Sequence, residues 1–278
     1  MTSPAALLDT AVAAARAAGA VLVDGLARPK DVVQKTERTS IVTWVDRAAQ
    51  AAALRVIGER YPDHAVLAEE DAEPVAAKAA GFLWLVDPLD GTSNYAHGIP
   101  FACSSVAVCD ADGPVAGAVF EPFRGELFMA SRGGGAWLGE ERLHVSSTER
   151  LERALVGTGV QSDDPEVIAG FGRRIVALST HCRGVRCVGS PALSLAYVAA
   201  GRADAFLERD GTYAWDVAAG ALMITEAGGR VEDLDGGPIN LGPGLANVLA
   251  SNGRIHEALA DVVRGRSSIR GGSRNGGV

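Results

Sequence analysis

The sequence predicts a layered αβαβα sandwich, and three observations carry that prediction. The chain of 278 residues is long enough for one large domain or two closely packed ones. Short apolar runs separated by turn residues fill its first half, which is typical of an antiparallel sheet backed by helices. After about Ser146, strand-like and helix-like segments alternate, which indicates a mixed α/β layer in the second half.

Two helices are expected near the start of the first half. Residues 4–27 are rich in alanine and carry apolar side chains at helical spacing. A second helix is expected from Asp46, as its N-cap, to Arg60, where Tyr61-Pro62 ends it. The apolar runs predicted to be strands are residues 65–68, 82–86, 104–109, 115–120 and 126–130. Gly133-Gly134-Gly135 is expected to form a hairpin turn before another short strand.

The second half is expected to alternate between the two kinds of element. Its predicted strands are residues 155–159, 185–188, 203–207, 230–232 and 246–250. Its predicted helices are residues 165–178, 191–200, 215–227 and 254–263. We therefore divide the chain into residues 1–145 and 146–264. The tail, residues 265–278, lacks apolar side chains for anchoring and is predicted to be disordered.

Composition excludes several classes of protein. Hydrophobic residues make up 47% and charged residues 22%, which is ordinary for a globular protein. The formal net charge of -8 argues against nucleic acid or an anionic membrane as the main partner. No basic segment precedes the apolar N-terminal stretch, and Asp9, Arg16 and Asp24 interrupt it, so a cytoplasmic protein is expected. The four cysteines form no Cys-x-x-Cys pair, which argues against a structural zinc site.

The segment WLVDPLDGTSN, residues 84–94, carries the clearest chemical signal. An apolar strand delivers Asp87 and Asp90 into a turn, and a helix start follows at Thr92. Carboxylates at this spacing can share hard divalent cations, while Gly91 lets the backbone approach a ligand closely. The free N–H groups of the helix start can hold phosphate oxygens. The alternative is an ordinary surface turn, because Asp, Pro and Gly are common turn formers.

Two further acidic segments favour the chemical interpretation. Glu69 and Glu70 follow a predicted strand, and Asp216 opens a hydrophobic helix. Taken alone, a Glu-Glu pair is usually a solvated surface, and an Asp at a helix start is usually an N-cap. The combination of the three segments, rather than any one of them, indicates a cation site for an anionic substrate.

These segments resemble those of the inositol monophosphatase family of magnesium-dependent phosphatases. The likeness rests on LAEED, WLVDPLDGTSN and AWDVAAGALMITEAGG, in this order, and extends over residues 5–262. The resemblance implies that Glu69, Asp87 and the carbonyl group of Leu89 bind a first Mg²⁺. It implies that Asp87, Asp90 and Asp216 bind a second ion and that Glu69 helps to hold a third. Mn²⁺ is an expected substitute.

The resemblance also implies catalytic roles, with Glu69 counted among the catalytic residues. Thr92, paired with Asp46, would orient the attacking water. The amide groups of Gly91, Thr92 and Ser93 would cradle the phosphate, and Lys35 would lie nearby as a cation. A cysteine nucleophile is not expected, because the sequence has no Cys-x5-Arg phosphatase loop.

Substrate contacts follow from the same resemblance. They are expected from Gly189, Ser190, Pro191, Glu208 and Asp216. The segment from Glu208 to Asp216 is one residue longer than the common family pattern, so Arg209 and Asp210 are alternatives to Glu208. Ser40 stands where the family usually has Asp.

The expected activity is that of a phosphoric monoester hydrolase acting on a small phosphorylated metabolite. The first expected substrate is myo-inositol 1-phosphate. Alternatives within the same chemistry are histidinol phosphate, fructose 1,6-bisphosphate and a 3′-phosphonucleotide. A non-catalytic binding protein is less favoured, because the residues expected to bind the metal are all present. The resemblance further implies a homodimer, with neither nucleic acid nor membrane as a partner.

Overall fold

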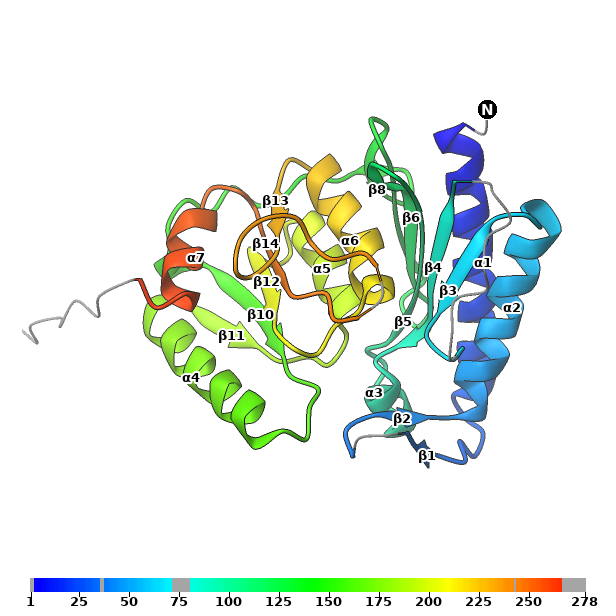
Figure 1. Ribbon diagram of the computed structural model, residues 1–278, viewed down its shortest axis with the longest axis horizontal. Coiled ribbons are helices and arrows are strands. Elements are labelled where there is room, and N and C mark those ends of the chain that lie inside the picture. Colours follow the sequence, from blue (N-terminus) through cyan, green and yellow to red (C-terminus); the bar gives the residue numbers. More distant parts are fainter. Residues whose placement is uncertain (1–2, 36–37, 72–80, 243, 267–278) are drawn as a thin grey trace, which may run out of the picture.

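The computed structural model describes residues 3–35, 38–71, 81–242 and 244–266. Helices and sheets alternate in five layers (Figure 1), so the predicted αβαβα sandwich is confirmed. Helices α1 (Pro4–Gly25) and α2 (Trp44–Arg60) cover one face of a seven-stranded sheet. Helices α5 (Pro191–Ala199) and α6 (Ala214–Glu226) separate it from a five-stranded sheet. Helices α4 (Pro165–His181) and α7 (His256–Val263) form the outermost layer.

The large sheet follows chain order. Its strands are β3 (Ala65–Ala68), β4 (Leu83–Asp90), β5 (Cys103–Asp110), β6 (Gly113–Glu121), β7 (Glu126–Ser131), β8 (Gly135–Leu138) and β9 (Glu141–Arg142). All neighbours pair antiparallel except β3 and β4, which pair parallel. The antiparallel sheet expected for the first half is therefore present, with one parallel pair at its β3 edge. The connection over residues 69–82 is long enough to return the chain for parallel pairing.

The small sheet has the order β11-β10-β12-β14-β13. Its strands are β10 (Leu155–Gly159), β11 (Gly184–Arg186), β12 (Ala205–Glu208), β13 (Arg230–Glu232) and β14 (Val248–Ser251). Strand β10 pairs parallel with β11 and β12, whereas β14 pairs antiparallel with β12 and β13. The mixed pairing agrees with the alternation read from the sequence.

Short elements complete the structure. The strand pair β1 (Val33–Gln34) and β2 (Ile41–Val42) and the helix α3 (Thr92–Ala96) lie at the edge where the site forms, and the 3₁₀ turn η1 (Leu151–Arg153) precedes the start of β10. The sequence did not predict β1, β2, β9 or η1, because two or three residues show no periodicity. The predicted disordered tail lies, from residue 267 onward, outside the described residues.

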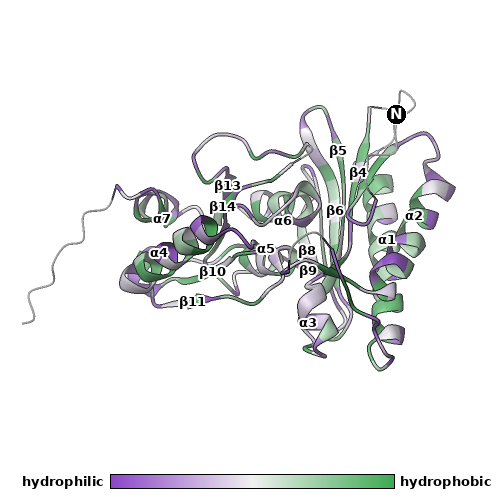
Figure 2. Ribbon diagram, turned by 60° about the horizontal axis from the view of Figure 1, so that its bottom comes forward, coloured by the Kyte–Doolittle hydropathy of each residue, from purple (hydrophilic) through white to green (hydrophobic). Residues whose placement is uncertain are grey.

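Helix α1 explains the apolar start of the chain. By length and composition it could cross a membrane, although the core helix of a globular protein passes the same test. Here its buried side chains, including Leu7, Ala11 and Leu22, pack on α2 and on the large sheet. Figure 2 shows hydrophobic residues concentrated in these packed layers. Helix α1 is thus accounted for by the core.

The main core cluster crosses the boundary proposed at residue 146. Leu85 and Phe128 of the large sheet belong to the same cluster as Leu193 of α5 and Met223 of α6. Because α5 and α6 pack against the large sheet, the ends of β4, β12 and these two helices are held close together. The site forms where those ends meet.

Candidate active site

The end of β4 is shaped by an interruption in its pairing with β5. Asp87 pairs with Ser105 and Asp90 with Cys103, and the register shifts between them. The Asp87 carboxylate accepts a hydrogen bond from the amide of Leu89 at 2.9 Å. Pro88 has no N–H to donate to the ladder. The irregular segment therefore brings two carboxylates to the edge of the sheet rather than to its opposite faces.

Gly91 turns the chain from β4 into α3. Its φ of 89° lies in the left-handed region, which favours glycine. A Cβ at this position would lie 2.9 Å from the carbonyl oxygen of Phe101 and 3.2 Å from that of Gly189. The first amides of α3, from Thr92 onward, have no acceptor within the helix and remain available for an anion.

Three carboxylates converge from separate segments of the chain. Ligand oxygens of Asp87, Asp90 and Asp216 lie within 4.8 Å of one another, and the three residues are 1%, 5% and 8% exposed. Asp216 lies in the first turn of α6, where its carboxylate accepts a hydrogen bond from the amide of Tyr213 at 2.7 Å. The convergence expected from the sequence is therefore present for these three residues.

The pKa values of all three carboxyl groups are raised in this buried, negatively charged cluster. Burial first, and then the neighbouring carboxylates, raise the pKa of Asp87 and of Asp216 well above the usual range. Burial also raises the pKa of Asp90 to about 6, although the Ser190 hydroxyl and the Ala192 amide oppose it. Clustered carboxylates are the ligands that hard divalent cations prefer, and such a cation would balance their charge. The residues present therefore fit Mg²⁺.

Glu69 lies in the same pocket but has a cationic partner of its own. Lys35 donates to the carboxylates of Glu69, at 3.0 Å, and Glu70, at 2.6 Å. Burial acts to lower the pKa of Lys35, but the two carboxylates outweigh it and raise that pKa. Burial, followed by Glu69, raises the pKa of Glu70 to about 7. The structure thus places Lys35 beside the site, as expected, and adds Glu70 as its second partner.

Thr92 and Asp46 form the expected pair. The Thr92 hydroxyl lies 3.0 Å from a carboxylate oxygen of Asp46 and 2.9 Å from the carbonyl oxygen of Leu89. Asp46 is not the N-cap of α2, so that expectation was wrong. Thr43 is the cap, and Asp46, three residues later, accepts from its amide and hydroxyl at 2.8 and 2.6 Å. This reciprocal capping box fixes the Asp46 carboxylate, while burial raises its pKa.

These groups line a pocket of about 320 Å³. The predicted site residues lining it are Glu69, Asp87, Leu89, Asp90, Gly91, Thr92, Ser93, Gly189, Ser190, Pro191, Glu208 and Asp216. Asp46 and Lys35 do not line the pocket themselves. Asp46 is hydrogen-bonded to Thr92, and Lys35 is hydrogen-bonded to Glu69. The sequence did not single out Thr39, Thr158, Gln161 or Tyr213, which also line the pocket, because no local motif marks them.

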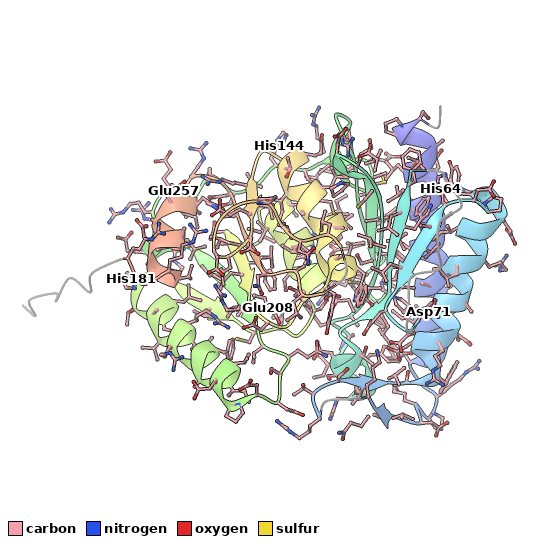
Figure 3. The ribbon with its side chains drawn as sticks, viewed as in Figure 1. His64, Asp71, His144, His181, Glu208 and Glu257 are labelled. Carbon is pink, nitrogen blue, oxygen red and sulfur yellow. The ribbon has the colours of Figure 1, made fainter. Side chains whose placement is uncertain are left out.

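Glu208, at the end of β12, occupies the part of the pocket formed by the second half (Figure 3). Its side chain is buried, with 3% of the residue exposed. Arg209 instead pairs with Asp235, and the Asp210 amide bonds to Asn247. The longer segment after Glu208 therefore does not remove Glu208 from the pocket, whereas neither Arg209 nor Asp210 lines it.

Ser190 has a partner inside the protein. Its hydroxyl donates to the carboxylate of Asp90, and the amide of Ala192 donates to the same oxygen at 2.8 Å. Residues from the start of α5 therefore orient a carboxylate at the end of β4. In this structure the Ser190 hydroxyl supports Asp90, and its expected contact with substrate stays a prediction.

The layered fold and the buried carboxylates beside a short helix fit the class of phosphatases that depend on metal ions. Comparison with known proteins identifies the family. The sequence model of the inositol monophosphatase family matches residues 3–268, so the chain belongs to that family.

Its relatives carry two kinds of name. Inositol-1-monophosphatase of Synechocystis sp. is 38% identical over 256 residues, covering 92% of this chain and 88% of that protein. Nus factor SuhB of Haemophilus influenzae is 37% identical, covering 93% and 96%. The crystal structure of extragenic suppressor protein SuhB from Bartonella henselae superposes with a TM-score of 0.87 at 35% identity, covering 93% of this chain and 98% of that one. Inositol monophosphatase from Anabaena gives 0.82 at 38% identity, covering 93% and 95%.

Proposed function

We propose that this protein hydrolyses a small phosphate monoester in a Mg²⁺-dependent reaction, with myo-inositol 1-phosphate as the first substrate. The observation that carries the proposal is the convergence of Asp87, Asp90 and Asp216 within 4.8 Å in a buried pocket. The name of the Synechocystis relative supports the choice of substrate. Histidinol phosphate, fructose 1,6-bisphosphate and a 3′-phosphonucleotide are the alternative esters.

Two or three Mg²⁺ ions, or Mn²⁺ as a substitute, would be held by Glu69, Asp87, Asp90, Asp216 and the carbonyl group of Leu89. When bound, such ions lower the pKa of water and neutralise charge that develops on the phosphoryl group and the leaving oxygen. The side chains around them supply orientation and charge balance.

Thr92 and Asp46 are suited to aim the attacking water. A hydroxyl has one proton, and donation to Asp46 at 3.0 Å leaves the lone pairs of Thr92 free to accept a hydrogen from water. The raised pKa of Asp46 makes its carboxylate a better proton acceptor than an exposed one. The capping box with Thr43 holds this carboxylate in place, so the orientation does not have to be created during the reaction.

The remaining contacts would hold the two ends of the ester. Amides of Gly91, Thr92 and Ser93 at the start of α3 would bind the phosphate oxygens. Glu208 and the segment 189–191 would contact the alcohol. Lys35 offsets part of the negative charge of Glu69 and Glu70, which lowers the repulsion that an anionic substrate meets.

The first prediction concerns a metal-ligand position. Asp90→Asn should reduce Mg²⁺-dependent phosphate release by about 10²-fold or more, because one ligand charge and the aim of its oxygens are lost. The variant should also show weaker Mg²⁺ binding by calorimetry. Asp9→Asn, on an exposed position of α1, is the matched control and should behave as the unaltered protein. Unchanged phosphate release from Asp90→Asn contradicts the assignment.

A non-catalytic binding protein is the competing function. It predicts ligand binding without turnover, whereas our proposal predicts phosphate release that stops when EDTA removes divalent ions and returns with Mg²⁺. Relative kcat/KM values over the four esters then identify the substrate. Ligand binding without phosphate release from any of them supports the competing function.

Location in the cytoplasm, a homodimeric state and the absence of nucleic acid or membrane partners belong to the same proposal. The net charge of -8 supports the absence of polyanionic partners. Because some relatives are named Nus factors, binding of nucleic acid by the present chain has to be measured. Light scattering measures the oligomeric state. A mobility-shift assay with RNA and DNA tests the expected absence of nucleic-acid binding.

A further inference from the structure

Asn94, in α3, joins two segments that are far apart in the sequence. Its side-chain amide donates to the carbonyl oxygen of Phe101 at 2.9 Å and to that of Val188 at 2.7 Å, and a longer contact of 3.5 Å reaches the carbonyl oxygen of Gly189. Phe101 lies between α3 and β5, whereas Val188 lies between β11 and α5. One side chain therefore ties the first half of the chain to the second at the edge where the site forms.

Each of the two joined segments reaches the Asp90 carboxylate two residues further on. Ser190 follows Val188 by two positions, and its hydroxyl donates to a carboxylate oxygen of Asp90. Cys103 follows Phe101 by two positions, and its Sγ lies 3.7 Å from the same carboxylate oxygen and 3.8 Å from Oγ of Ser190. The three side chains that meet here are buried. Asp90 is therefore held from two sides, by the two segments that the amide group joins.

The two segments need a donor between them in order to stay together. The carbonyl oxygens of Phe101, Val188 and Gly189 all face the amide nitrogen of Asn94, and oxygen atoms that carry partial negative charge repel one another. The amide group supplies two hydrogens, which the two shorter bonds use. Without this donor the carbonyl groups would turn towards water, and the segments that reach Asp90 would separate.

We propose that Asn94 is a positioning residue that fixes the Asp90 carboxylate for a divalent cation, acting through residues 101–103 and 188–190. This inference rests on the proposed phosphatase function, in which Asp90 is a metal ligand. Mg²⁺ demands near-ideal octahedral geometry, so a small displacement of one carboxylate weakens its binding. Asn94 is not among the described residues that line the pocket, so its effect on the cation is exerted through other residues.

The test measures Mg²⁺ binding to the full-length protein by calorimetry, with no ester present. Asn94→Ala removes the amide donor. Asn252→Ala is the matched control, because the Asn252 amide also joins separate segments, by donating to the Ser146 hydroxyl at 2.9 Å and the Thr148 carbonyl oxygen at 2.8 Å. Asn252 follows β14 at the end of the small sheet opposite to Glu208. Urea unfolding with EDTA present should show a loss of stability in both variants, whereas only Asn94→Ala should lose affinity for Mg²⁺.

The dissociation constant for Mg²⁺ should rise about 5- to 30-fold in Asn94→Ala and stay within about 2-fold of the unaltered value in Asn252→Ala. Ser190→Ala should also raise it. The double variant Asn94→Ala/Ser190→Ala should then raise it by less than the product of the two single effects, because both substitutions act on the Asp90 carboxylate. If Asn94→Ala does not fold, Asn94→Ser takes its place and should show a smaller loss of affinity, because its hydroxyl retains one donor.

Three results would overturn the inference. They are an unchanged dissociation constant in the Asn94 variant, single effects that multiply fully in the double variant, and an equal loss of Mg²⁺ affinity in Asn252→Ala, which would point to a general loss of stability. The proposed function fails separately, if the unaltered protein takes up no Mg²⁺ and releases no phosphate from any of the four esters.

Discussion

Burial of acidic side chains is the main physical feature of this protein at the scale of single residues. Burial, with a contribution from Asp90, raises the pKa of Glu208 to about 8, while Arg174 of α4 acts in the opposite direction. Glu208 consequently keeps its proton over much of the neutral range. In that form the carboxyl group can donate as well as accept a hydrogen bond, which suits a polyol hydroxyl.

The titration of Glu208 gives a prediction for stability. In the unfolded chain this group has a pKa near 4.5, so the folded state binds the proton more tightly. The stability that the protonated group contributes is complete below pH 4.5 and is lost as pH rises through about 8. Glu208→Gln cannot ionise, so it should gain stability relative to the unaltered protein by roughly 1–4 kcal/mol between pH 5 and pH 9.

Urea unfolding at several pH values, with EDTA present, measures this difference. Glu140→Gln, at an exposed position, is the control and should follow the unaltered protein throughout. Parallel stability profiles for Glu208→Gln and the unaltered protein would show that burial does not hold the proton on Glu208.

The sequence located site residues where a local motif surrounds them. Asp87, Asp90 and Asp216 lie in short stretches whose residue types already match cation chemistry. Thr39 and Thr158 lie in ordinary surroundings, and their shared pocket exists only after the layers pack. The role of Asp46 in helix capping was misjudged because Thr43 and Asp46 both suit a helix start, and only their reciprocal bonds distinguish the cap from the third helical residue.

At the scale of elements, the close approach of α5 and α6 positions the start of each helix in the site. Gly220 of α6 makes this approach possible, because a Cβ there would lie 2.4 Å from Cβ of Leu195 in α5. Helix α6 carries Asp216 in its first turn, and α5 follows directly after Ser190. A displacement of one helix relative to the other would therefore move Asp216 relative to Ser190 in the pocket.

Gly220→Ala tests this packing. Alanine normally favours a helix over glycine by about 1 kcal/mol, but here the forced separation of α5 and α6 should destabilise the protein by about 1–3 kcal/mol. Gly58→Ala in α2 is the matched control, because no atom lies within 4 Å of its added Cβ, and it should stabilise by about 0.5–1 kcal/mol. Urea unfolding of both variants measures the contrast, and a gain in stability for Gly220→Ala would contradict the packing argument.

Element prediction succeeded where segments were long or bounded by turn residues. The hairpin at Gly133-Gly134-Gly135, for example, joins β7 to β8 as expected. Strand direction was harder to predict, since an apolar run such as β3 has the same pattern in parallel and antiparallel sheets. Parallel pairing of β3 with β4 needs a connection long enough to return the chain, and the residues of β3 do not encode this.

At the scale of the whole molecule, the two halves share one interior and one site. Helices α5 and α6, from the second half, pack against the large sheet of the first half. The carboxylate of Asp90, from the first half, accepts hydrogen bonds from Ser190 and Ala192 of the second. Near residue 146 the sequence pattern changes from strands joined by turns to strands that alternate with helices. This change marks a different way of connecting strands, and the hydrophobic core continues across it.

A fragment of residues 1–145 provides the test at this scale. Without α5 and α6, the face of the large sheet that contains Leu85 and Phe128 would meet water, and burial of such apolar surface supplies most of the favourable free energy of folding. The fragment should lack near-ultraviolet circular dichroism and a cooperative urea transition, and should bind a hydrophobic dye, whereas the full chain should unfold in one cooperative step. Mixing it with residues 146–266 should restore part of the Mg²⁺-dependent phosphate release, because both fragments contribute carboxylates to the site. Cooperative unfolding of residues 1–145 alone would mean that the first half has a sufficient core of its own, made by α1, α2 and the covered face of the sheet.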